Sequence, residues 1–461
     1  MTTLVLTTQL MGELSQGAQN ALEVAGVLFV RVLDAADGSR RLLGRGLRWV
    51  PQEEYIEQES FGLIIPPTGY IAALAEAEQN GDTAVWFHTH PGLDGIPRPS
   101  SHDREVDRQI ADLFRIRTGS SYYGTLIFSP RSAGCAFTGT IHPEDGNVES
   151  IDRIWVVGDS WKLLSSFNSD RADIPTLFER NVRAFGPDMQ LALRELHVAI
   201  VGCGGTGSSV AEQLVRLGVR NFTLIDNDTV SESNVTRLYG STPNDVGFPK
   251  VEVVAQHLTR IAPDARCRSI QGMISLQHIA FELTSADLVF GCTDDNAGRL
   301  VLSRLSTYLL TPVIDLGVLL SSSEDGTLSD IDGRVTVLSP GSACLVCRDR
   351  IDLQRAAAEL MTPDERRRLQ DEGYAPALAG VEPAVVAFTT AVAAAAVAEM
   401  LERFIAYGPE PRPSEVLLRF HEREISTNSR ACRERHYCHQ NSNKWGWGGG
   451  SPFLEQTWPG A

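Results

Sequence analysis

Four glycines between a strand-like run and a helix-like run constrain the fold of this chain most. The segment "VAIVGCGGTGSSVAEQLVRLGV" passes from apolar residues through Gly202, Gly204, Gly205 and Gly207 to a helical pattern. Small residues at such a junction let backbone N–H groups and the helix N-terminus approach a phosphate or a ribose. Asp226 ends the next strand-like run, "NFTLID", where an acidic residue meets ribose hydroxyls. The loop alone leaves two alternatives open, which are an NAD(P) or FAD site and a tight turn without a ligand.

Apolar runs alternate with helical segments from residue 196 onward. The runs "LHVAIVG", "NFTLID", "ADLVFGCTD" and "TPVIDLG" are typical of buried strands. Their alternation with helices predicts an α/β domain with a Rossmann-like, doubly wound, mainly parallel sheet. Before residue 150, "VAGVLFVRVL" and "GTLIFSP" predict strands and "EVDRQIADLFRI" predicts an amphipathic helix. We therefore expect a separate N-terminal α/β domain.

The 461 residues allow two to four domains, at roughly 100–200 residues each. We expect an N-terminal domain over 1–160, a linker over 161–175, a second domain over 176–440 and a flexible Gly- and Trp-rich tail over 441–461.

Charge and apolar patterning exclude two broad classes of partner. The formal net charge of −17 argues against general nucleic-acid binding, which needs clustered Lys and Arg. The most apolar run, 384–401, is rich in Ala and carries Glu399, so it predicts a buried helix rather than a membrane span. The N-terminus lacks a signal-peptide pattern, and the late paired cysteines suggest metal binding in a reducing compartment, so we expect a cytoplasmic protein.

Two histidines near residue 90 form the first candidate site. His88 and His90 are spaced i, i+2, so on a strand both imidazoles point to the same side. Asp103 could add a carboxylate ligand from the following segment. Two histidines and one carboxylate leave a fourth position for water, which is the arrangement of a catalytic zinc site. Histidines on a polar surface loop are the alternative.

The surrounding stretch resembles the JAMM/JAB metalloprotease family. That family's pattern is Glu, then His-x-His-Pro, then Ser-x-x-Asp, and "EVAGVLFV", "HTHP" and "SSHD" supply Glu23, His88, His90, Ser100 and Asp103. The resemblance implies that Glu23 is the general base and that Ser100 donates to an oxyanion. It also implies cleavage after the C-terminal glycine of a ubiquitin-like protein. The gap before the aspartate is two residues longer than the commonest form of the pattern.

Several ordered blocks around the glycine loop argue against a dehydrogenase. "RNVRAFG", "DNDTVSESNVTR", "VGFPKVE" and "GCTDDNAGR" resemble the ubiquitin-activating enzyme family, which includes the ThiF and MoeB activators of sulfur-carrier proteins. The family's Gln after its Arg is Leu238 here. The resemblance implies that ATP and Mg²⁺ bind this domain. The implied roles are ribose binding by Gly205 and Asp226, triphosphate binding by Asn234, Arg237 and Lys250, Mg²⁺ binding by Asp294, and contact of Arg183 with the phosphates of a neighbouring subunit.

Four late cysteines form a second metal candidate. Cys344-x-x-Cys347 and the wider pair Cys432 and Cys438 would close a structural zinc site, as the two Cys pairs of that family do. Because the second pair is wide, His436 or His439 could replace one ligand. Reduced, buried cysteines without metal are the alternative.

The sequence between 348 and 383 contains no cysteine, although many members of that family carry an acyl-accepting cysteine there. This favours direct hand-off of the activated product, with an oxyester on a hydroxyl such as that of Thr362 as an alternative.

Our hypothesis from the sequence is therefore a homodimeric enzyme with two activities. It trims or releases a ubiquitin-like protein at its terminal glycine and adenylates the same glycine, with a conjugating enzyme as a further partner. The alternatives are activation of a sulfur carrier for cofactor or cysteine synthesis, and a non-catalytic, nucleotide-binding scaffold.

Overall fold

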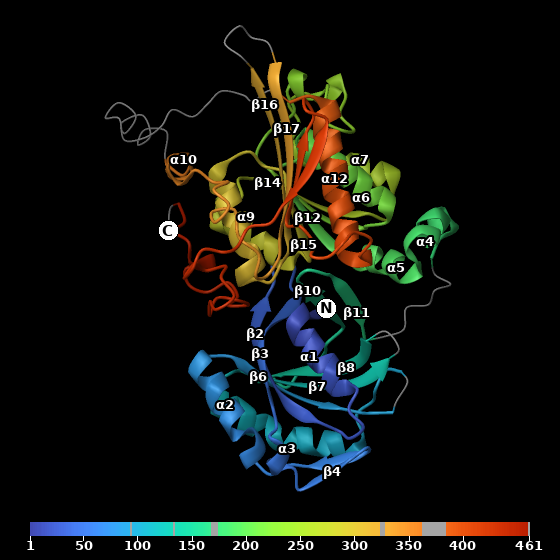
Figure 1. Ribbon diagram of the computed structural model, residues 1–461, viewed down its shortest axis with the longest axis vertical. Helices are drawn as coiled ribbons and strands as arrows, with labels where there is room; N and C mark the ends of the chain where they lie inside the picture. The colour runs from blue at the N-terminus through green and yellow to red at the C-terminus, as the bar shows by residue number, and fades with distance from the viewer. Residues whose placement is uncertain (93–94, 132–133, 167–173, 323–327, 362–383, 460–461) are drawn as a thin grey trace. The chain divides into compact units, whose positions relative to one another are not determined.

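The computed structural model describes residues 1–461 apart from 93–94, 132–133, 167–173, 323–327, 362–383 and 460–461. The chain divides into two compact units (Figure 1). The first consists of Met1–Asp170 and Gly446–Gly448, and the second of Arg171–Trp445 and Gly449–Ala461.

The first unit contains a nine-stranded mixed sheet in the order β11-β10-β1-β3-β2-β6-β7-β8-β9. Its strands are β1 (Thr2–Thr7), β2 (Ala25–Asp34), β3 (Arg40–Trp49), β6 (Thr83–Thr89), β7 (Tyr122–Arg131), β8 (Gly134–Pro143), β9 (Glu149–Ser150), β10 (Arg153–Val157) and β11 (Lys162–Ser165). The pairs β1–β3, β1–β10 and β6–β7 are parallel, and the other pairs are antiparallel. A separate hairpin pairs β4 (Glu57–Glu59) with β5 (Gly62–Ile64).

Two apolar cores cover the two faces of this sheet. Strand β6 contributes to both, because successive side chains of a strand point to opposite faces: Val85 and Phe87 lie in one core, and Ala84 and Trp86 in the other. Helix α1 (Thr8–Ala18) packs in the first core, and α2 (Thr68–Asn80) and α3 (Ser101–Thr118) pack in the second. The predicted strands and helix of this region correspond to β2, β7 and α3.

The predicted linker over 161–175 begins within the first unit. Trp161 is buried, and β11 pairs antiparallel with β10, so these residues complete the edge of the sheet. Residues 167–173 of that linker lie outside the described part of the chain.

The second unit contains an eight-stranded sheet in the order β14-β13-β12-β15-β16-β17-β18-β19. Its strands are β12 (His197–Val201), β13 (Asn221–Asp226), β14 (Arg266–Gln271), β15 (Leu288–Gly291), β16 (Val313–Ser322), β17 (Leu328–Leu338), β18 (Glu415–Arg419) and β19 (Glu424–Asn428). The pairs from β14 to β16 are parallel, and those from β16 to β19 are antiparallel. The prediction of a mainly parallel α/β sheet is confirmed for the first five strands of this order.

Helices cover both faces of the second sheet (Figure 1). One side carries α6 (Gly205–Leu217), α7 (Lys250–Ile261) and α12 (Val386–Ile405), and the other carries α9 (Asn296–Tyr308) and α10 (Leu353–Glu359). Among the described residues of this unit, the other α-helices are α4 (Glu179–Phe185), α5 (Pro187–Glu195) and α8 (Gln277–Phe281). The Ala-rich run forms the buried helix α12, and none of the described helices has both the length and the apolar character needed to span a bilayer.

The C-terminal segment differs from the flexible tail that the sequence predicted over 441–461. Phe453, Leu454 and Trp458 are buried. The Tyr308 hydroxyl donates to a Glu455 carboxylate oxygen at 2.9 Å, which ties the segment to α9. Apolar side chains therefore order the described part of this segment despite its glycines.

Candidate functional site

The glycine loop connects β12 to α6 through a turn that has no room for side chains at two positions. Gly202 has a φ of +92°, and a Cβ there would lie 2.6 Å from the carbonyl oxygen of Cys292. A Cβ at Gly207 would lie 1.8 Å from the Gly202 oxygen, so both positions require glycine. At Gly204, the N-cap of α6, a Cβ would meet nothing within 4 Å. The loop is thus closed on its protein side and open above the helix N-terminus, where an anion is favoured.

Asp226 braces this loop from the end of β13. One carboxylate oxygen accepts from the backbone N–H of Cys203 at 2.6 Å, and the other accepts from the N–H of Asp228 at 2.8 Å. Burial raises the pKa of Asp226, and the nearby positive charge of Lys250 opposes that shift. The predicted ribose residue therefore lies directly against the glycine loop.

Lys250 begins α7 and is 8% exposed. Its Nζ lies 2.7 Å from a carboxylate oxygen of Asp228, which is 64% exposed. The amine is thus held beside Asp226 by a carboxylate that water reaches, so an incoming anion could replace that partner.

Arg237 packs its aliphatic stem against the glycine loop. A Cβ built on Gly205 would lie 3.3 Å from Cγ and Cδ of Arg237, whose Nη1 donates to the Ser233 carbonyl at 2.8 Å. Asn234 accepts from the Ser231 N–H at 3.1 Å and so shapes the turn that precedes Arg237. The structure brings Arg237 to the loop, whereas the amide of Asn234 is used to hold its own turn.

The remaining predicted residues of this site lie on the surface. Asp294 is exposed just beyond the carboxyl end of β15, where its carboxylate is available to a cation. Arg183 is exposed on α4 and forms an ion pair with Glu179 one turn away. Contact of Arg183 with a neighbouring subunit stays a prediction.

The sequence analysis missed a buried charge cluster next to the loop. The carboxylate of Asp315 is 0% exposed and accepts from Arg299 Nε and Nη2 at 3.0 and 2.8 Å, and from Arg334 Nη2 at 3.2 Å. Beside it, Arg350 donates twice to Glu415, at 3.2 and 3.1 Å. An aspartate inside the apolar run "TPVIDLG" was the available signal, because a buried carboxylate needs a cationic partner.

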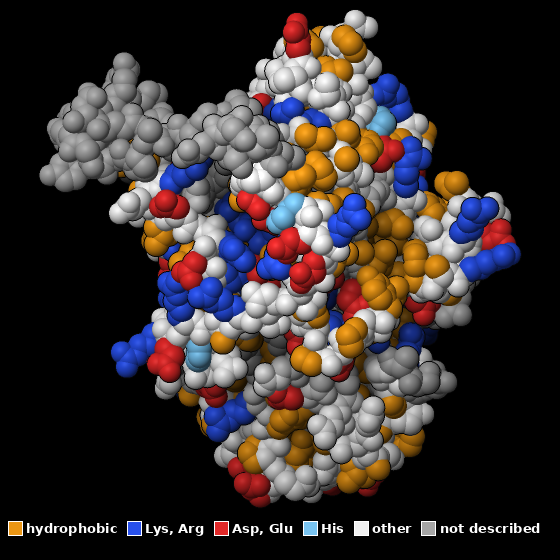
Figure 2. All heavy atoms as spheres, turned by 45° about the horizontal axis from the view of Figure 1, so that its top comes forward, with side chains coloured by type: hydrophobic (Ala, Val, Ile, Leu, Met, Phe, Trp, Pro, Cys, Tyr) orange, Lys and Arg blue, Asp and Glu red, His pale blue; other side chains and the backbone are white. Residues whose placement is uncertain are grey.

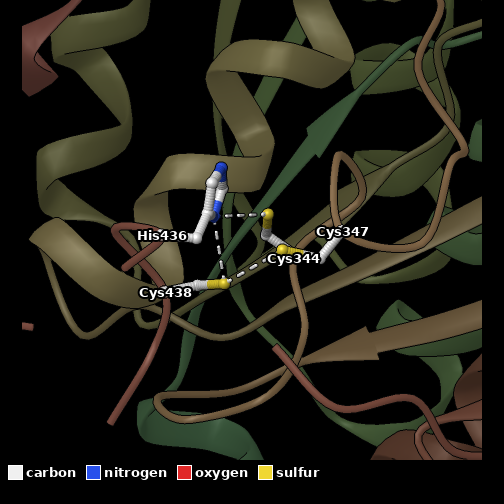
Figure 3. A group of neighbouring side chains, drawn as sticks. All are labelled: Cys344, Cys347, His436 and Cys438. Carbon is white, nitrogen blue, oxygen red and sulfur yellow. Dashed lines mark hydrogen bonds between the residues drawn. The ribbon is translucent and has the colours of Figure 1, made fainter. Parts of the chain in front are cut away.

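Three cysteines and one histidine form a compact group in the second unit (Figure 3). The distances are 3.6 Å from Cys344 Sγ to His436 Nδ1, 3.3 Å from His436 Nδ1 to Cys438 Sγ, and 3.7 Å from Cys347 Sγ to Cys438 Sγ. Burial lowers the pKa of His436, which keeps the imidazole neutral, the form that binds metal. Four such ligands fit a closed, tetrahedral zinc site.

This group corrects the predicted ligand set at one position. His436 takes the place that the sequence analysis gave to Cys432. The Cys432 thiol points toward the carbonyl oxygens of Gly341 and Cys438, at 3.5 and 3.4 Å. The left-handed backbone of Arg435, with a φ of +58°, immediately precedes the histidine and is part of the turn between the two late cysteines.

In the first unit, the structure brings His88, His90 and Asp103 together. His88 lies near the end of β6 and is buried, and Asp103 lies in the first turn of α3. The Asp103 carboxylate lies 3.4 Å from His88 Nε2 and 3.7 Å from His90 Nε2, and the two Nε2 atoms are 3.1 Å apart. Burial raises the pKa of Asp103, but the hydrogen bonds from both histidines outweigh it and hold the pKa well below its usual range. Three ligand atoms therefore converge, and the longer loop does not separate them.

Glu23 and Ser100 flank this group in different ways. Glu23 precedes β2 and is 6% exposed; burial raises its pKa, while the charges of His88 and His90 lower it. Ser100 is the N-cap of α3: its hydroxyl accepts from the Asp103 N–H at 3.1 Å, and its own N–H donates to the Asp103 carboxylate at 2.6 Å. The serine thus fixes the orientation of Asp103, a role that the sequence analysis did not assign to it.

Asp107 is a half-buried carboxylate that the sequence analysis missed. It lies one turn after Asp103 on α3 and accepts from the Tyr123 hydroxyl at 3.1 Å. Burial raises the pKa of Asp107 to about 6. The i, i+4 spacing from Asp103, which places both residues on one helix face, was the signal that could have found it.

Comparisons with known proteins find several relatives of similar sequence. Molybdopterin-synthase adenylyltransferase of Escherichia coli (strain K12) is 33% identical over 172 residues, which cover 37% of this chain and 65% of the relative. Ubiquitin-like modifier-activating enzyme 5 of Oryza sativa subsp. japonica is 32% identical over 169 residues, which cover 34% and 38%. Sulfur carrier protein ThiS adenylyltransferase of Escherichia coli (strain K12) is 34% identical over 127 residues, which cover 28% and 51%.

The chain thus spans between 38% and 65% of the length of these relatives. The model of the ThiF family matches residues 178–441, which include the glycine loop, the buried charge cluster and the Cys/His group. Because this match covers more than half of its length, the chain belongs to the ThiF family.

Proposed function

We propose that this chain activates a ubiquitin-like or sulfur-carrier protein by ATP-dependent adenylation of its C-terminal carboxylate. The observation that carries the proposal is the ThiF family match over residues 178–441. Within this range, the glycine loop lies next to Asp226 and Arg237, and Lys250 lies beside Asp226. The names of the relatives support the same reaction class, since two are adenylyltransferases and one activates a ubiquitin-like modifier.

The chemistry needs charge stabilisation more than a protein nucleophile. An oxygen of the substrate carboxylate bonds to the α-phosphorus of ATP, the bond to the β-phosphate oxygen breaks, and pyrophosphate leaves with the displaced electron pair. Lys250 and Arg237 offset the negative charge that spreads over the phosphate oxygens. Asp226 orients the ribose. Asp294 would hold Mg²⁺, which supplies further positive charge at the phosphates when it is bound.

The activated product passes directly to an acceptor in this proposal. The sequence contains no cysteine between 348 and 383, and burial raises the pKa of the Cys203 and Cys292 thiols, so neither is a ready nucleophile. A homodimer in which Arg183 completes the neighbouring site, and a conjugating enzyme as acceptor, belong to the same proposal. The Cys344, Cys347, His436 and Cys438 group would hold zinc, which supplies a cross-link between chain segments rather than chemistry.

ATP–pyrophosphate exchange tests this function. The full chain is incubated with ATP, labelled pyrophosphate and a panel of ubiquitin-like and sulfur-carrier proteins that end in Gly-Gly. Exchange that requires the carrier protein and its free terminal carboxylate supports the proposal. ATP binding without exchange with every carrier favours the non-catalytic scaffold instead.

A second candidate function is zinc-dependent hydrolysis of the bond after the terminal glycine of the same protein. The observation that favours it is the convergence of His88, His90 and Asp103, with Glu23 close enough to feel their charges. These three residues would hold zinc, which supplies a Lewis acid when bound. Glu23 would accept and return the proton of the attacking water, and Ser100 keeps Asp103 in position.

One substrate would serve both proposed activities, because cleavage exposes the glycine carboxylate that adenylation uses. A substrate with an extension after the glycine tests the second activity. Cleavage by the zinc-loaded chain, and loss of cleavage in His88→Ala with pyrophosphate exchange intact, are expected. Cleavage that survives in His88→Ala would rule out this site.

A further inference from the structure

Helices α6 and α9 begin at the same edge of the sheet, but their N-termini differ. Val201, the last residue of β12, pairs with Gly291, the last residue of β15, and the two helices follow shortly after these strands. Each helix N-terminus carries a partial positive charge that attracts anions. That of α6 is open, because a Cβ at Gly204 would meet nothing within 4 Å. That of α9 is occupied by carboxylates of this chain.

The carboxylates at the first turn of α9 come from two segments. The Asp295 side chain is the N-cap and accepts from the Gly298 N–H. Glu359, on α10, accepts from the Ala297 N–H at 2.8 Å with one oxygen and from Asn296 Nδ2 at 3.4 Å with the other. Because Asp295 already caps the helix, the second carboxylate is more than the start of α9 requires.

Helix α10 is attached to α9 near both of its ends. At the start of α10, the Asp352 N–H donates to Asn296 Oδ1 at 3.0 Å, and the Asp352 side chain caps α10. At the end of α10, the Glu359 side chain is 10% exposed and lies 3.3 Å from Arg355 Nε. Asn296 thus contacts both ends of α10, so the whole helix holds the Glu359 carboxylate in place.

The turn that these contacts hold carries Asp294, which is exposed and directly precedes the N-cap. Burial lowers the pKa of Arg299, but acidic neighbours, Asp315 foremost and Asp294 among them, raise it above its ordinary value. All three nitrogens of the Arg299 guanidinium are directed at Asp315 and the Arg350 carbonyl, so this arginine does not occupy the Asp294 carboxylate. In the space-filling view, basic and acidic side chains mix on the side that carries α9 and α10 (Figure 2).

A cation next to a helix N-terminus is disfavoured by the helix dipole. Asp294 lies at such an N-terminus, so the partial positive charge of α9 opposes Mg²⁺ binding there. Glu359 adds a negative charge at that N-terminus and accepts one of its N–H groups. The start of α9 is thereby suited to a cation, whereas the start of α6 stays open to an anion.

We propose that Glu359 is a positioning residue for Asp294: it fixes the first turn of α9 and offsets the positive charge there, so that Asp294 can bind the Mg²⁺ of a nucleotide. This inference rests on the proposed adenylation, because that function gives Asp294 its Mg²⁺. It gives α10, which is far from the glycine loop in sequence, a part in nucleotide binding.

Calorimetric titration of the full chain with α,β-methylene-ATP, with and without added Mg²⁺, tests this proposal without turnover. We expect Glu359→Ala to raise the Kd in Mg²⁺ by about tenfold, as loss of an outer partner of a metal ligand does, and to leave the Kd without Mg²⁺ nearly unchanged. Glu359→Gln keeps an acceptor for the Ala297 N–H but lacks the charge, so its Kd in Mg²⁺ should lie between the two. Gln354→Ala, at an exposed position of the same helix, is the matched control and should bind as the unaltered chain does.

The outcomes separate a positioning role from a merely structural one. A Kd that rises equally with and without Mg²⁺ in Glu359→Ala, or that does not rise at all, would overturn the proposal. If Glu359→Ala does not fold, Glu359→Gln decides, and a Kd in Mg²⁺ equal to that of the unaltered chain would overturn it. An unaltered chain whose nucleotide affinity does not respond to Mg²⁺ would remove the role of Asp294 and this inference with it. The adenylation proposal fails separately, if the unaltered chain binds nucleotide with Mg²⁺ but exchanges no pyrophosphate with any carrier protein.

Discussion

Replacement of His436 by Ala is expected to weaken metal binding at the Cys/His group far more than replacement of Cys432 by Ser. A tetrahedral zinc site with Zn–S of about 2.3 Å and Zn–N of about 2.0 Å places its ligand atoms roughly 3.5–3.8 Å apart. The distances among Cys344, His436, Cys438 and Cys347, from 3.3 to 3.7 Å, agree with that geometry. Cys432 lies next to Cys438 but is not one of the four converging ligands, and its thiol donates to the backbone carbonyls of Gly341 and Cys438.

The expected loss of metal affinity follows from the contribution of each ligand to the binding free energy. Structural zinc sites bind with about 10–16 kcal/mol in total, so one of four ligands contributes roughly 3–4 kcal/mol. Loss of His436 should therefore weaken metal binding on the order of a hundred- to a thousand-fold.

Substitution with Co²⁺ provides the assay. Its sulfur-to-metal charge-transfer absorption reports the cysteine site and is silent for a site made of histidine and aspartate, so the His88 group does not interfere. A chelator competition then gives the affinity of each variant. Cys432→Ser should stay within a few-fold of the unaltered chain. The reasoning is refuted if Cys432→Ser loses the charge-transfer band while His436→Ala retains both the band and the affinity.

Three further outcomes are expected. Lys250→Ala should lower kcat/KM for pyrophosphate exchange by about 10²-fold or more, since it removes a cation at the phosphates. Arg260→Ala, on the exposed face of the same helix, is the control. A decrease below threefold in Lys250→Ala would contradict the role of Lys250. The rate of hydrolysis should fall on acidification at a pH above the ordinary carboxyl range, because burial raises the pKa of Glu23 and the base must be ionised. Glu23→Gln should be inactive at every pH. A pH-independent rate of the unaltered chain would contradict the role of Glu23 as base. The unfolding free energy should decrease as pH rises from about 4 to 6, because burial raises the pKa of Asp107 to about 6 and the folded chain then binds this proton more tightly than the unfolded chain. Asp107→Asn keeps an acceptor for Tyr123 and should remove about 1–2 kcal/mol of that decrease, after allowance for partial exposure. Urea unfolding at pH 4 and 7 measures the change. If the unfolding free energy of the variant depends on pH as strongly as that of the unaltered chain, Asp107 is not the group responsible.

Local signals in the sequence predicted the glycine loop and its two strands well. The apolar runs at β12 and β13 are uninterrupted, and two of the loop glycines, Gly202 and Gly207, are required by contacts at the neighbouring strand or a few residues away. Asp226 was predictable for the same reason, since its place at a strand end depends on local pattern.

Features that depend on distant pairing were not predictable in this way. The partners of Asp315 come from α9 and β17, and Glu415 pairs across an antiparallel extension that no alternation of strands and helices indicated. The choice between Cys432 and His436 depends on the backbone of one turn, whose left-handed residue is an arginine rather than a glycine. The residue types alone do not predict that turn.

The Cys/His group joins parts of the chain that are 91 or 92 positions apart. A tie of that span restricts the unfolded chain as a disulfide would, by an entropy equivalent to about 4–5 kcal/mol in the chain-entropy model. Unlike a disulfide, this tie can be opened by a chelator or by oxidation of its thiols without cutting a covalent bond. The half-life of the second unit in a cell would therefore depend on the supply of metal and on the redox state, two variables that have no direct part in the chemistry at the glycine loop.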